Sequence, residues 1–339
     1  MPGGKPQPDR DIQPTDAPDF FIGDVPVVGR VFLSPMAGFS DSPYRLLCRE
    51  HGAGFSFTEF VSAHALSHGC PEALSLFRFH EHERPIIFQI FGNDRARLLA
   101  AALRAQELGP DVIDINMGCS VKHVAHKGSG AGLLRDPVAT GRLFESLARA
   151  LEVPLTAKIR IGWDPQNLNY REMARVLESS GAAMISVHGR TKVQGYKGVA
   201  DWEAIGEVAA RVRVPVLGNG DVRSFEDARA RQRTYGLAGV LIGRAAMGNP
   251  WIFENPARPI GEAERIGVMR KHFESMAAHY GEAEAVVLFR KHAARYIAGG
   301  TLLRAHRLAL LTAASAPEFA DLCGELLGRA RSCADEFAA

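Results

Sequence analysis

Residues 85–119, which read PIIFQIFGNDRARLLAAALRAQELGPDVIDINMGC, contain the pattern that decides the fold. Two short apolar runs, PIIFQIFG (85–92) and VIDINMGC (112–119), flank a stretch with leucine and alanine at helical spacing. Continuous apolar runs are typical of strands that are buried on both faces. The helical stretch ends at Gly109, a residue type that favours a helix C-terminus. The segment therefore predicts a strand, a helix and a second, parallel strand.

The same alternation continues along residues 31–247, where eight apolar runs are separated mostly by stretches with helical patterning. The runs are VFLSPMAG (31–38), FSFTEFV (55–61), PIIFQIFG (85–92), VIDINMGC (112–119), PLTAKIRIG (154–162), AMISVHGR (183–190), VPVLGNGD (214–221) and GVLIGRAAM (239–247). Eight strand–helix units over roughly 220 residues predict an α/β fold of the (β/α)8, or TIM-barrel, class. A doubly wound open sheet is the alternative. We disfavour it because SPMAGFSDSP stands where that fold usually carries G-x-G-x-x-G.

Local signals mark where individual helices begin. The stretch at 136–151 opens with Asp136 and Pro137, a typical N-cap and first-turn pair. Ser224 is followed three residues later by Asp227, which is close to a capping box. We expect helices to start at both places.

Changes of pattern divide the chain into three regions. Residues 1–30 are interpreted as a disordered leader and the entry to the barrel, because the first residues are polar and rich in proline. Residues 31–254 are the expected barrel. Residues 255–339 contain no convincing strand and have apolar residues at helical spacing, which predicts a separate bundle of about four helices. The expected breaks in this bundle are Gly281, Gly299-Gly300 and Pro317.

Composition excludes several classes of protein. With 46% hydrophobic and 23% charged residues, the 339-residue chain is neither disordered nor collagen-like. Its net charge of +2 carries no nucleic-acid signal over the whole chain. The five cysteines form no CxxC pair, which argues against a zinc ribbon or a disulfide framework. Four of them are expected to be inert: Cys48, Cys70, Cys323 and Cys333. With no apolar run long enough to span a bilayer, we expect a cytoplasmic protein without membrane contact. We expect no bound metal, because His64, His68, His80 and His82 form no tight ligand motif, and we expect a monomer.

Polar residues gather at the ends of the predicted strands, where barrel enzymes carry their active sites. Gly220, Gly243 and Arg244 follow the seventh and eighth runs, the usual phosphate site of such barrels. Lys158 and Gln89 could hold a planar ring that carries carbonyl and N–H groups, such as a flavin.

Cys119 stands directly after the fourth run, beside Asn116, and is our candidate catalytic residue. A cysteine considered alone is more often structural, but its place at a strand end favours catalysis. The adjacent stretch HKGSGAGLL (126–134) has three glycines and suggests a mobile loop or lid.

Taken in order, the motifs LSPMAGFSDSPYR, FQIFG, DINMGC, AKIRIGW, VHGRT, GNGD and IGRAAMGNPWIF resemble the tRNA-dihydrouridine synthases, most closely the bacterial B-type branch. The resemblance is strong over residues 31–254. It is weaker at FRKHAARYIAG (289–299), which is similar to the family's RNA-binding helical domain. One departure is Ser120, where the family usually has proline after the catalytic cysteine.

The resemblance implies reduction of the C5–C6 double bond of uridines in tRNA, using FMN that NADPH, or NADH, reduces. It implies that Cys119 donates the proton and that Asn116 orients the uracil. The implied flavin contacts are Pro35, Met36 and Ala37 along the flavin, Gln89 and Lys158 at its ring system, and His188, Asn219, Gly220, Asp221, Gly243 and Arg244 at the ribityl chain and phosphate.

A basic block at residues 286–317 contains no Asp or Glu. Its charged and aromatic members are Arg290, Lys291, His292, Arg295, Tyr296, Arg304, His306 and Arg307. The block could be a solvated helix face. With the resemblance, we expect Lys291 and Arg295 to contact tRNA phosphates, with Arg190 and Lys192 adding contacts at the barrel rim.

Two other functions stay open. One is an FMN-dependent barrel oxidoreductase that acts on a free pyrimidine. The other is a non-catalytic RNA-binding relative. The helical domain with its basic block argues against the first, and the intact Cys119 argues against the second.

Overall fold

The computed structural model describes residues 17–298 and 304–338, with side chains described as far as residue 330. The start of the expected leader, residues 1–16, and the side chain of Cys333 lie outside the described residues.

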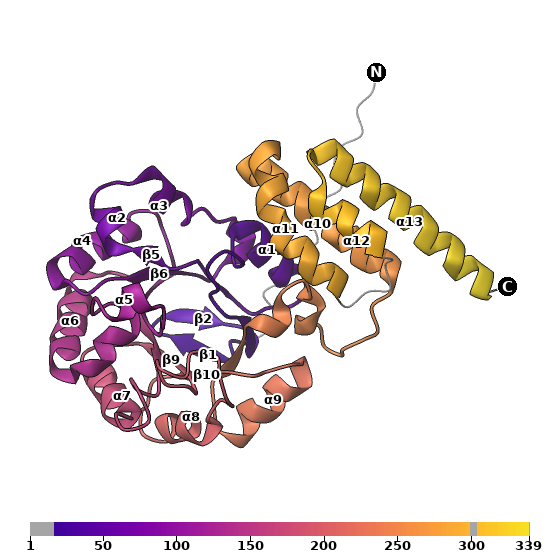
Figure 1. The fold of residues 1–339 in the computed structure, drawn as a ribbon. Coiled ribbons are helices and arrows are strands. Elements are labelled where there is room, and N and C mark those ends of the chain that lie inside the picture. The colour runs from indigo at the N-terminus through magenta and orange to yellow at the C-terminus, as the bar shows by residue number, and fades with distance from the viewer. Residues whose placement is uncertain (1–16, 299–303, 339) are drawn as a thin grey trace.

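A parallel sheet curls into a barrel, as predicted (Figure 1). Its strands are β3 (Val31–Leu33), β4 (Ser56–Phe57), β5 (Val61–Ser62), β6 (Ile86–Phe91), β7 (Val112–Met117), β8 (Leu155–Arg160), β9 (Met184–His188), β10 (Val216–Asn219) and β11 (Gly239–Ile242). They run in the order β3-β11-β10-β9-β8-β7-β6-β4, and β5 also pairs with β6. A hydrogen bond from the Gly54 amide to the Val31 carbonyl, 3.2 Å long, links the two edges. The predicted (β/α)8 barrel is confirmed.

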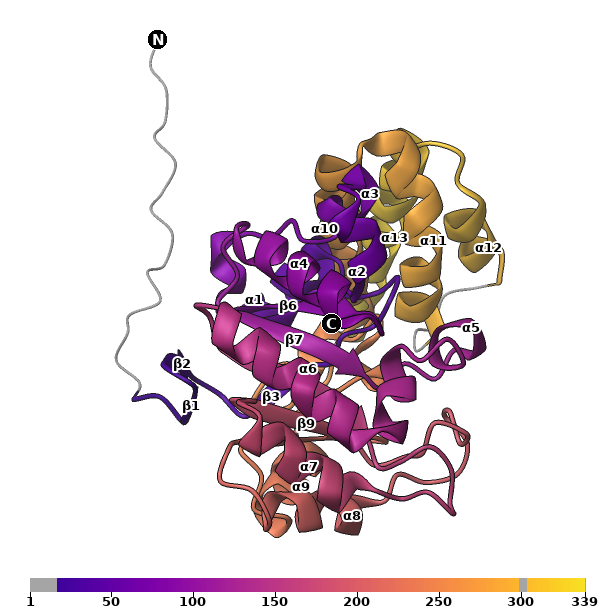
Figure 2. The same cartoon turned by 90° about the vertical axis from the view of Figure 1, so that its left-hand side faces the viewer.

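Helices cover the outside of the barrel (Figure 1). They are α1 (Ser42–Glu50), α2 (Ala63–Ser67), α3 (Pro71–Ser75), α4 (Arg95–Gln106), α6 (Pro137–Ala150), α7 (Tyr170–Ser179), α8 (Trp202–Ala209) and α9 (Phe225–Thr234). The short helix α5 (Lys122–Ala125) instead lies after β7, at the ends of the strands (Figure 2). The predicted helix starts are correct. The Asp136 carboxylate accepts the Ala139 N–H at 2.9 Å, and the Ser224 hydroxyl accepts the Asp227 N–H at 3.1 Å.

A hairpin of β1 (Phe20–Ile22) and β2 (Val25–Val27) covers the barrel at the end where the strands begin (Figure 2). Ile22 and Val27 are fully buried against the first residues of several strands, among them Val112. This corrects the interpretation of residues 1–30: part of that segment is an ordered hairpin, whose strands are too short to show a pattern in the sequence.

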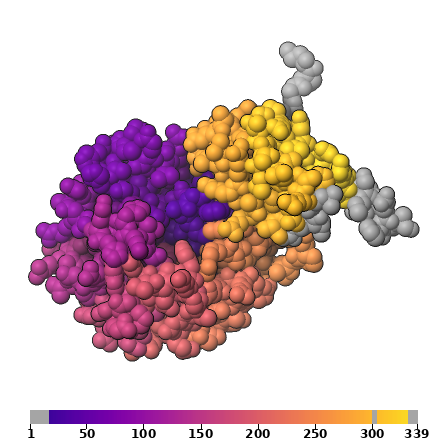
Figure 3. All heavy atoms as spheres, in the orientation of Figure 1, coloured from indigo at the N-terminus to yellow at the C-terminus, as the bar shows by residue number. Residues whose placement is uncertain are grey.

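The C-terminal region is helical, as predicted, and consists within the described residues of α10 (Glu262–Tyr280), α11 (Glu282–Ala298), α12 (Arg304–Thr312) and α13 (Ala316–Ala338). Gly281, with φ 86°, separates α10 from α11. These helices share an apolar cluster that includes Phe273 and Phe289, and they lie against one side of the barrel near α1 (Figures 1 and 3). Among the described helices, none is both long and apolar enough for a membrane crossing.

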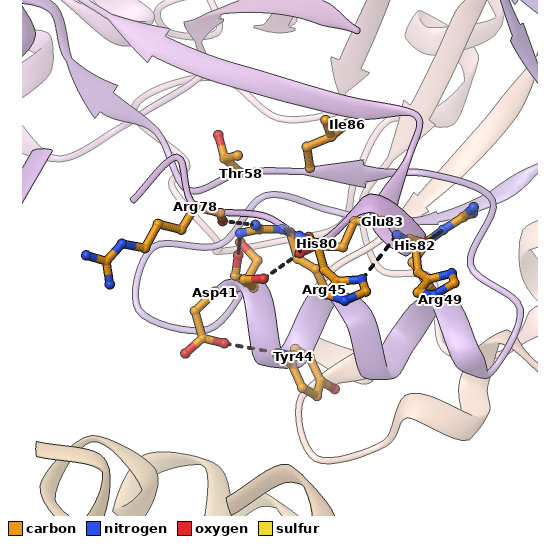
Figure 4. A network of polar contacts seen from close by, with 12 residues as sticks. Asp41, Tyr44, Arg45, Arg49, Thr58, Arg78, His80, His82, Glu83 and Ile86 are labelled. Atoms are coloured by element: carbon orange, nitrogen blue, oxygen red, sulfur yellow. Dashed lines mark hydrogen bonds and ion pairs between the residues drawn. The ribbon is translucent and has the colours of Figure 1, made fainter. Parts of the chain in front are cut away.

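A buried ion pair holds α1, the barrel helix nearest to these C-terminal helices (Figure 4). Arg45 Nε donates to Glu83 Oε2 at 2.6 Å, and both side chains are almost fully buried. The guanidinium also donates to the carbonyls of Ser40 and Arg78, while the second Glu83 oxygen accepts from the Ser42 hydroxyl. These bonds satisfy both buried charges.

Candidate active site

A cavity of about 620 Å³ opens at the ends of the barrel strands. Twelve of the residues predicted from the sequence line it: Pro35, Met36, Ala37, Asn116, Cys119, Lys158, His188, Asn219, Gly220, Asp221, Gly243 and Arg244. The structure therefore gathers strand-end residues from β3 and from β7 through β11 around one space. Gln89, Arg190, Lys291 and Arg295 do not line it.

The loop that carries Cys119 is held from both sides. Asn116 Oδ1 accepts the backbone N–H of Gly118 at 3.1 Å and that of Cys119 at 2.9 Å. Arg160 Nε donates to the Gly118 carbonyl at 2.7 Å. These bonds fix the backbone on which the half-buried thiol stands.

Burial raises the pKa of the Cys119 thiol, against a smaller lowering by a backbone hydrogen bond from Val121 and by the Arg160 charge. The thiol is therefore protonated at neutral pH. A group in this state can donate a proton but is a poor nucleophile.

Gln89 lies outside the cavity wall and contacts Asn116 instead. Its amide donates to Asp114 Oδ2 at 2.8 Å and its carbonyl accepts from Asn116 Nδ2 at 2.8 Å. Thr156 completes the chain by donating to Asp114 Oδ1 at 2.7 Å. Burial raises the pKa of Asp114 to about 6. This fully buried side chain orients Asn116, and its contact with a ring stays a prediction.

Lys158 places an ammonium group in the cavity wall. Its Nζ donates to Asn219 Oδ1 at 3.2 Å, and Asn219 Nδ2 donates to the Leu241 carbonyl at 2.9 Å. Burial, assisted by the neighbouring Arg160 charge, lowers the pKa of Lys158 to about 8. The group is thus a cation at neutral pH that deprotonates under mildly alkaline conditions.

His188 is neutral. Burial and the nearby cations, Arg160 first among them, hold its pKa well below the usual value. Arg190 Nη1 lies 3.3 Å from His188 Nε2. Because a guanidinium only donates, Nε2 accepts and the imidazole proton belongs on Nδ1.

Arg190 and Asp221 form a buried anchor at the cavity edge. Arg190 Nη2 donates to both Asp221 oxygens, at 2.6 and 2.8 Å, and its side chain is 1% exposed. Such a group does not reach an RNA phosphate, so the predicted tRNA contact of Arg190 is corrected. Lys192, predicted beside it, lies within 3.0 Å of His126 Nε2 and is also largely buried.

Asp221 in turn positions Arg244, whose Nη2 donates to Asp221 Oδ1 at 3.1 Å. Partial burial alone would raise the pKa of Asp221, but the bond from Arg190 and the Ala200 amide outweigh it, so the carboxylate stays charged. About half of the Arg244 side chain is exposed, so the guanidinium is accessible to an anion. The negative charge of the Asp221 carboxylate suits this residue for holding Arg244 and not for contacting a phosphate.

The glycine-rich stretch after Cys119 is packed. Residues 130–135 form a 3-10 helix, and most of them are buried. Gly130 has φ 56°, and a Cβ on it would lie 2.9 Å from the Cys119 Cβ. A Cβ on Gly132 would lie 2.6 Å from the Ala125 carbonyl oxygen. These glycines permit close backbone packing against the cysteine loop, while His126 and Lys127 at the start of the stretch are exposed, and a lid at 126–134 stays a prediction.

Among the lining residues that were not assigned from the sequence, Arg160 and Tyr196 stand beside the predicted cations. Arg160 lines the cavity, and its position two residues after Lys158 at the end of the fifth run was a signal for it. Tyr196 also lines the cavity, with its ring centre 5.9 Å from the Arg160 guanidinium and 5.0 Å from that of Arg244. It lies in an irregular loop, where no pattern in the sequence marks it.

The basic block is shared between two helices: Arg304, His306 and Arg307 lie on α12, and the other named members lie on two faces of α11. Lys291 is half-buried and Arg295 is exposed. The Lys291 Nζ lies 5.8 Å from the centre of the Phe39 ring, which lines the cavity. His292 and Tyr296 are fully buried, so the aromatic residue that seemed interleaved with the basic ones belongs to the helical core.

Fold and site together define a (β/α)8 barrel enzyme with a thiol and several cations at the strand ends. The family described as Dihydrouridine synthase (Dus) matches residues 32–322. The chain is 41% identical to tRNA-dihydrouridine synthase B of Pseudomonas putida, covering 72% of this chain and 76% of the relative. It is 40% identical to the probable tRNA-dihydrouridine synthase of Rhodobacter capsulatus, covering 65% and 68%. The chain belongs to the dihydrouridine synthase family.

A solved structure, histamine dehydrogenase from Rhizobium sp. 4-9, matches 76% of this chain and 50% of its own, with a TM-score of 0.56 and 13% identity. At this identity the likeness shows a shared fold alone.

Proposed function

We propose that this chain reduces uridines in tRNA to 5,6-dihydrouridine, with FMN as the cofactor and NADPH, or NADH, as the reductant. The observation that carries the proposal is a protonated thiol, Cys119, held at the wall of a cavity that also carries an ammonium and a guanidinium. Family membership supports the reaction type.

The cavity suits a phosphorylated flavin. Gly243 leaves room at the end of β11, since a Cβ there would meet nothing closer than 3.8 Å. The accessible Arg244 could pair with a phosphate, and the Lys158 ammonium could pair with negative charge on a ring system. Pro35, Met36 and Ala37 would pack along the flavin. When bound, FMN supplies the hydride that C6 of uracil accepts.

The residues of this chain would complete the reduction by delivering a proton to C5. Cys119 holds that proton on Sγ, because burial keeps the thiol protonated at neutral pH. Asn116 fixes the cysteine backbone through two N–H bonds, and Arg160 fixes the preceding carbonyl. General acid catalysis of this kind contributes about 10²–10⁴-fold to a rate.

The helical region would hold the tRNA. Lys291 and Arg295 lie one turn apart on α11, and Lys291 lies beside the loop that lines the cavity. A base reaching the cavity must leave its stack, which suits an enzyme that acts on a bound polynucleotide. We propose that the protein works as a cytoplasmic monomer.

The test compares substrates directly. The protein, loaded with FMN and reduced by NADPH, is incubated with tRNA from cells that lack this gene and, separately, with free uridine. Formation of dihydrouridine in the tRNA alone is expected. Reduction of free uridine at an equal rate would favour a small-molecule oxidoreductase, and failure to bind FMN would favour a non-catalytic RNA-binding protein.

A further inference from the structure

A second cluster of polar side chains lies away from the cavity, where α1 meets α10 and α11. Asp41, His272 and His292 each offer one ligand atom, and these atoms lie within 4.8 Å of one another. All three side chains are more than nine-tenths buried. None of them lines the cavity of the candidate active site.

Three of the four imidazole nitrogens of this cluster lack partners among the described residues. His272 Nε2 and both ring nitrogens of His292 have no hydrogen-bond partner among the described residues. Buried polar atoms are nearly always paired, so three such atoms in one place indicate a missing partner. The surroundings are aromatic: Phe39 lies 5.2 Å from His292, and Tyr44 lies 5.1 Å from His272, measured between ring centres.

Two of the three side chains, His272 and Asp41, are held by hydrogen bonds from outside the cluster, whereas neither ring nitrogen of His292 has a partner among the described residues. His272 Nδ1 lies 3.2 Å from the Tyr296 hydroxyl, which leaves Nε2 to face the cluster. Asp41 accepts the Tyr44 N–H at 3.2 Å with one oxygen and the Tyr280 hydroxyl at 3.2 Å with the other (Figure 4 shows Asp41 and Tyr44). Each carboxylate oxygen keeps a further lone pair.

We propose that Asp41, His272 and His292 bind one divalent transition-metal ion, with Zn²⁺ as the best-suited occupant. Two imidazole nitrogens and a carboxylate oxygen are ligands that Zn²⁺ accepts, and Fe²⁺ and Mn²⁺ also bind such sets. Mg²⁺ and Ca²⁺ prefer oxygen ligands throughout. Arg45 and Lys291 place positive charge near Asp41, Lys291 also acts on His292, and the Glu59 carboxylate lies near Asp41 and Lys291.

The ion would fasten the C-terminal helices to the barrel. Its ligands come from the N-terminus of α1 in the barrel and from α10 and α11, two consecutive helices of the C-terminal region that are joined through Gly281. His292 directly follows Lys291. A bond between His292 and the ion would therefore fix α11 at the place where its basic face meets the loop beside the cavity. This inference does not depend on the proposed function, because metal binding is measured without tRNA.

The experiment uses the full-length protein, free of any affinity tag, stripped with a chelator and titrated with ZnCl₂. Binding of one Zn²⁺ per chain is expected, together with a higher melting temperature. His272→Gln and His292→Gln are each expected to lose both effects. His279→Gln, a half-buried histidine on α10 outside the cluster, should retain them. Asp41→Asn should lose them as well, whereas Asp136→Asn, a matched helix-cap change on α6, should not.

Co²⁺ loaded into the wild-type protein keeps the test decisive if a variant does not fold. The expected visible spectrum is that of nitrogen and oxygen ligation. Thiolate-to-cobalt charge transfer would place the ion at a cysteine and overturn the proposal. No stoichiometric binding by the wild type, or equal binding by both histidine variants, would also overturn it, and the cluster would then be a metal-free polar junction.

Discussion

Replacing Gln89 by leucine tests whether the buried chain of hydrogen bonds behind the cavity wall positions Cys119. The substitution conserves approximate size and removes two bonds, leaving Asp114 Oδ2 and Asn116 Nδ2 without their partner. An unsatisfied buried polar group costs about 1–3 kcal/mol, so the free energy of unfolding should fall by about 2–6 kcal/mol.

The same substitution should slow catalysis. Asn116 would lose the bond that fixes the orientation of its side chain. Its Oδ1 would then no longer be held in place to accept the backbone N–H groups of Gly118 and Cys119. A misplacement of about 1 Å at a reacting group can cost 10²-fold in rate. We therefore expect a single-turnover rate of dihydrouridine formation about 10²-fold below wild type, with normal FMN content.

The assay pairs urea unfolding with single-turnover kinetics on NADPH-reduced, FMN-loaded protein. Gln166→Leu is the control, because Gln166 is exposed and should change stability by less than about 0.5 kcal/mol. A Gln89→Leu protein that loses less than about 1 kcal/mol and turns over at the wild-type rate would refute the positioning role.

Three further predictions concern the cavity and the helical region. Cys119→Ala should keep bound FMN but lose about 10²–10⁴-fold in turnover, measured as dihydrouridine in tRNA, and near-normal product would remove the thiol from the mechanism. FMN binding by the apo-protein should weaken as the pH rises through about 8, because the Lys158 ammonium, whose pKa burial lowers to that value, loses its charge there. Lys158→Met should bind FMN more weakly but without this pH dependence, and an unchanged titration curve would contradict the assignment. Lys291→Glu combined with Arg295→Glu should weaken tRNA binding and lower the slope of its salt dependence by about 2, at unchanged FMN occupancy. Binding equal to wild type would make this face an ordinary solvated one.

The predicted fold agrees with the structure because its signals are local. Apolar runs fit strands that are buried on both faces, and Asp136 and Ser224 cap helices through bonds to residues three positions away. The hairpin at Phe20–Val27 was missed, since strands of three residues are too short for a period to appear.

The residues that line the cavity were largely predictable, but the contacts that each of them makes were not. Strand ends of a barrel converge whatever their side chains, so Cys119, Lys158 and Arg244 could be assigned to one site from the sequence alone. Whether a side chain such as Gln89 or Arg190 faces the cavity or a neighbouring strand depends on contacts across the sheet. The Gln89 amide is taken up by Asp114 and Asn116 on the adjacent strand, and Arg190 by Asp221.

The sequence by itself determined the barrel, the helical C-terminal region and the position of the Cys119 thiol at a strand end, because periodicity and strand-end position are properties of consecutive residues. Only the tertiary structure decided which polar groups are buried and what they contact. The bonds from Gln89 to Asp114 and Asn116, and the meeting of Asp41 with His272 and His292, join residues far apart in the chain. No spacing in the sequence encodes such contacts, since they arise only when separate elements pack together. Packing removes water from the polar atoms, which then need a partner within the protein.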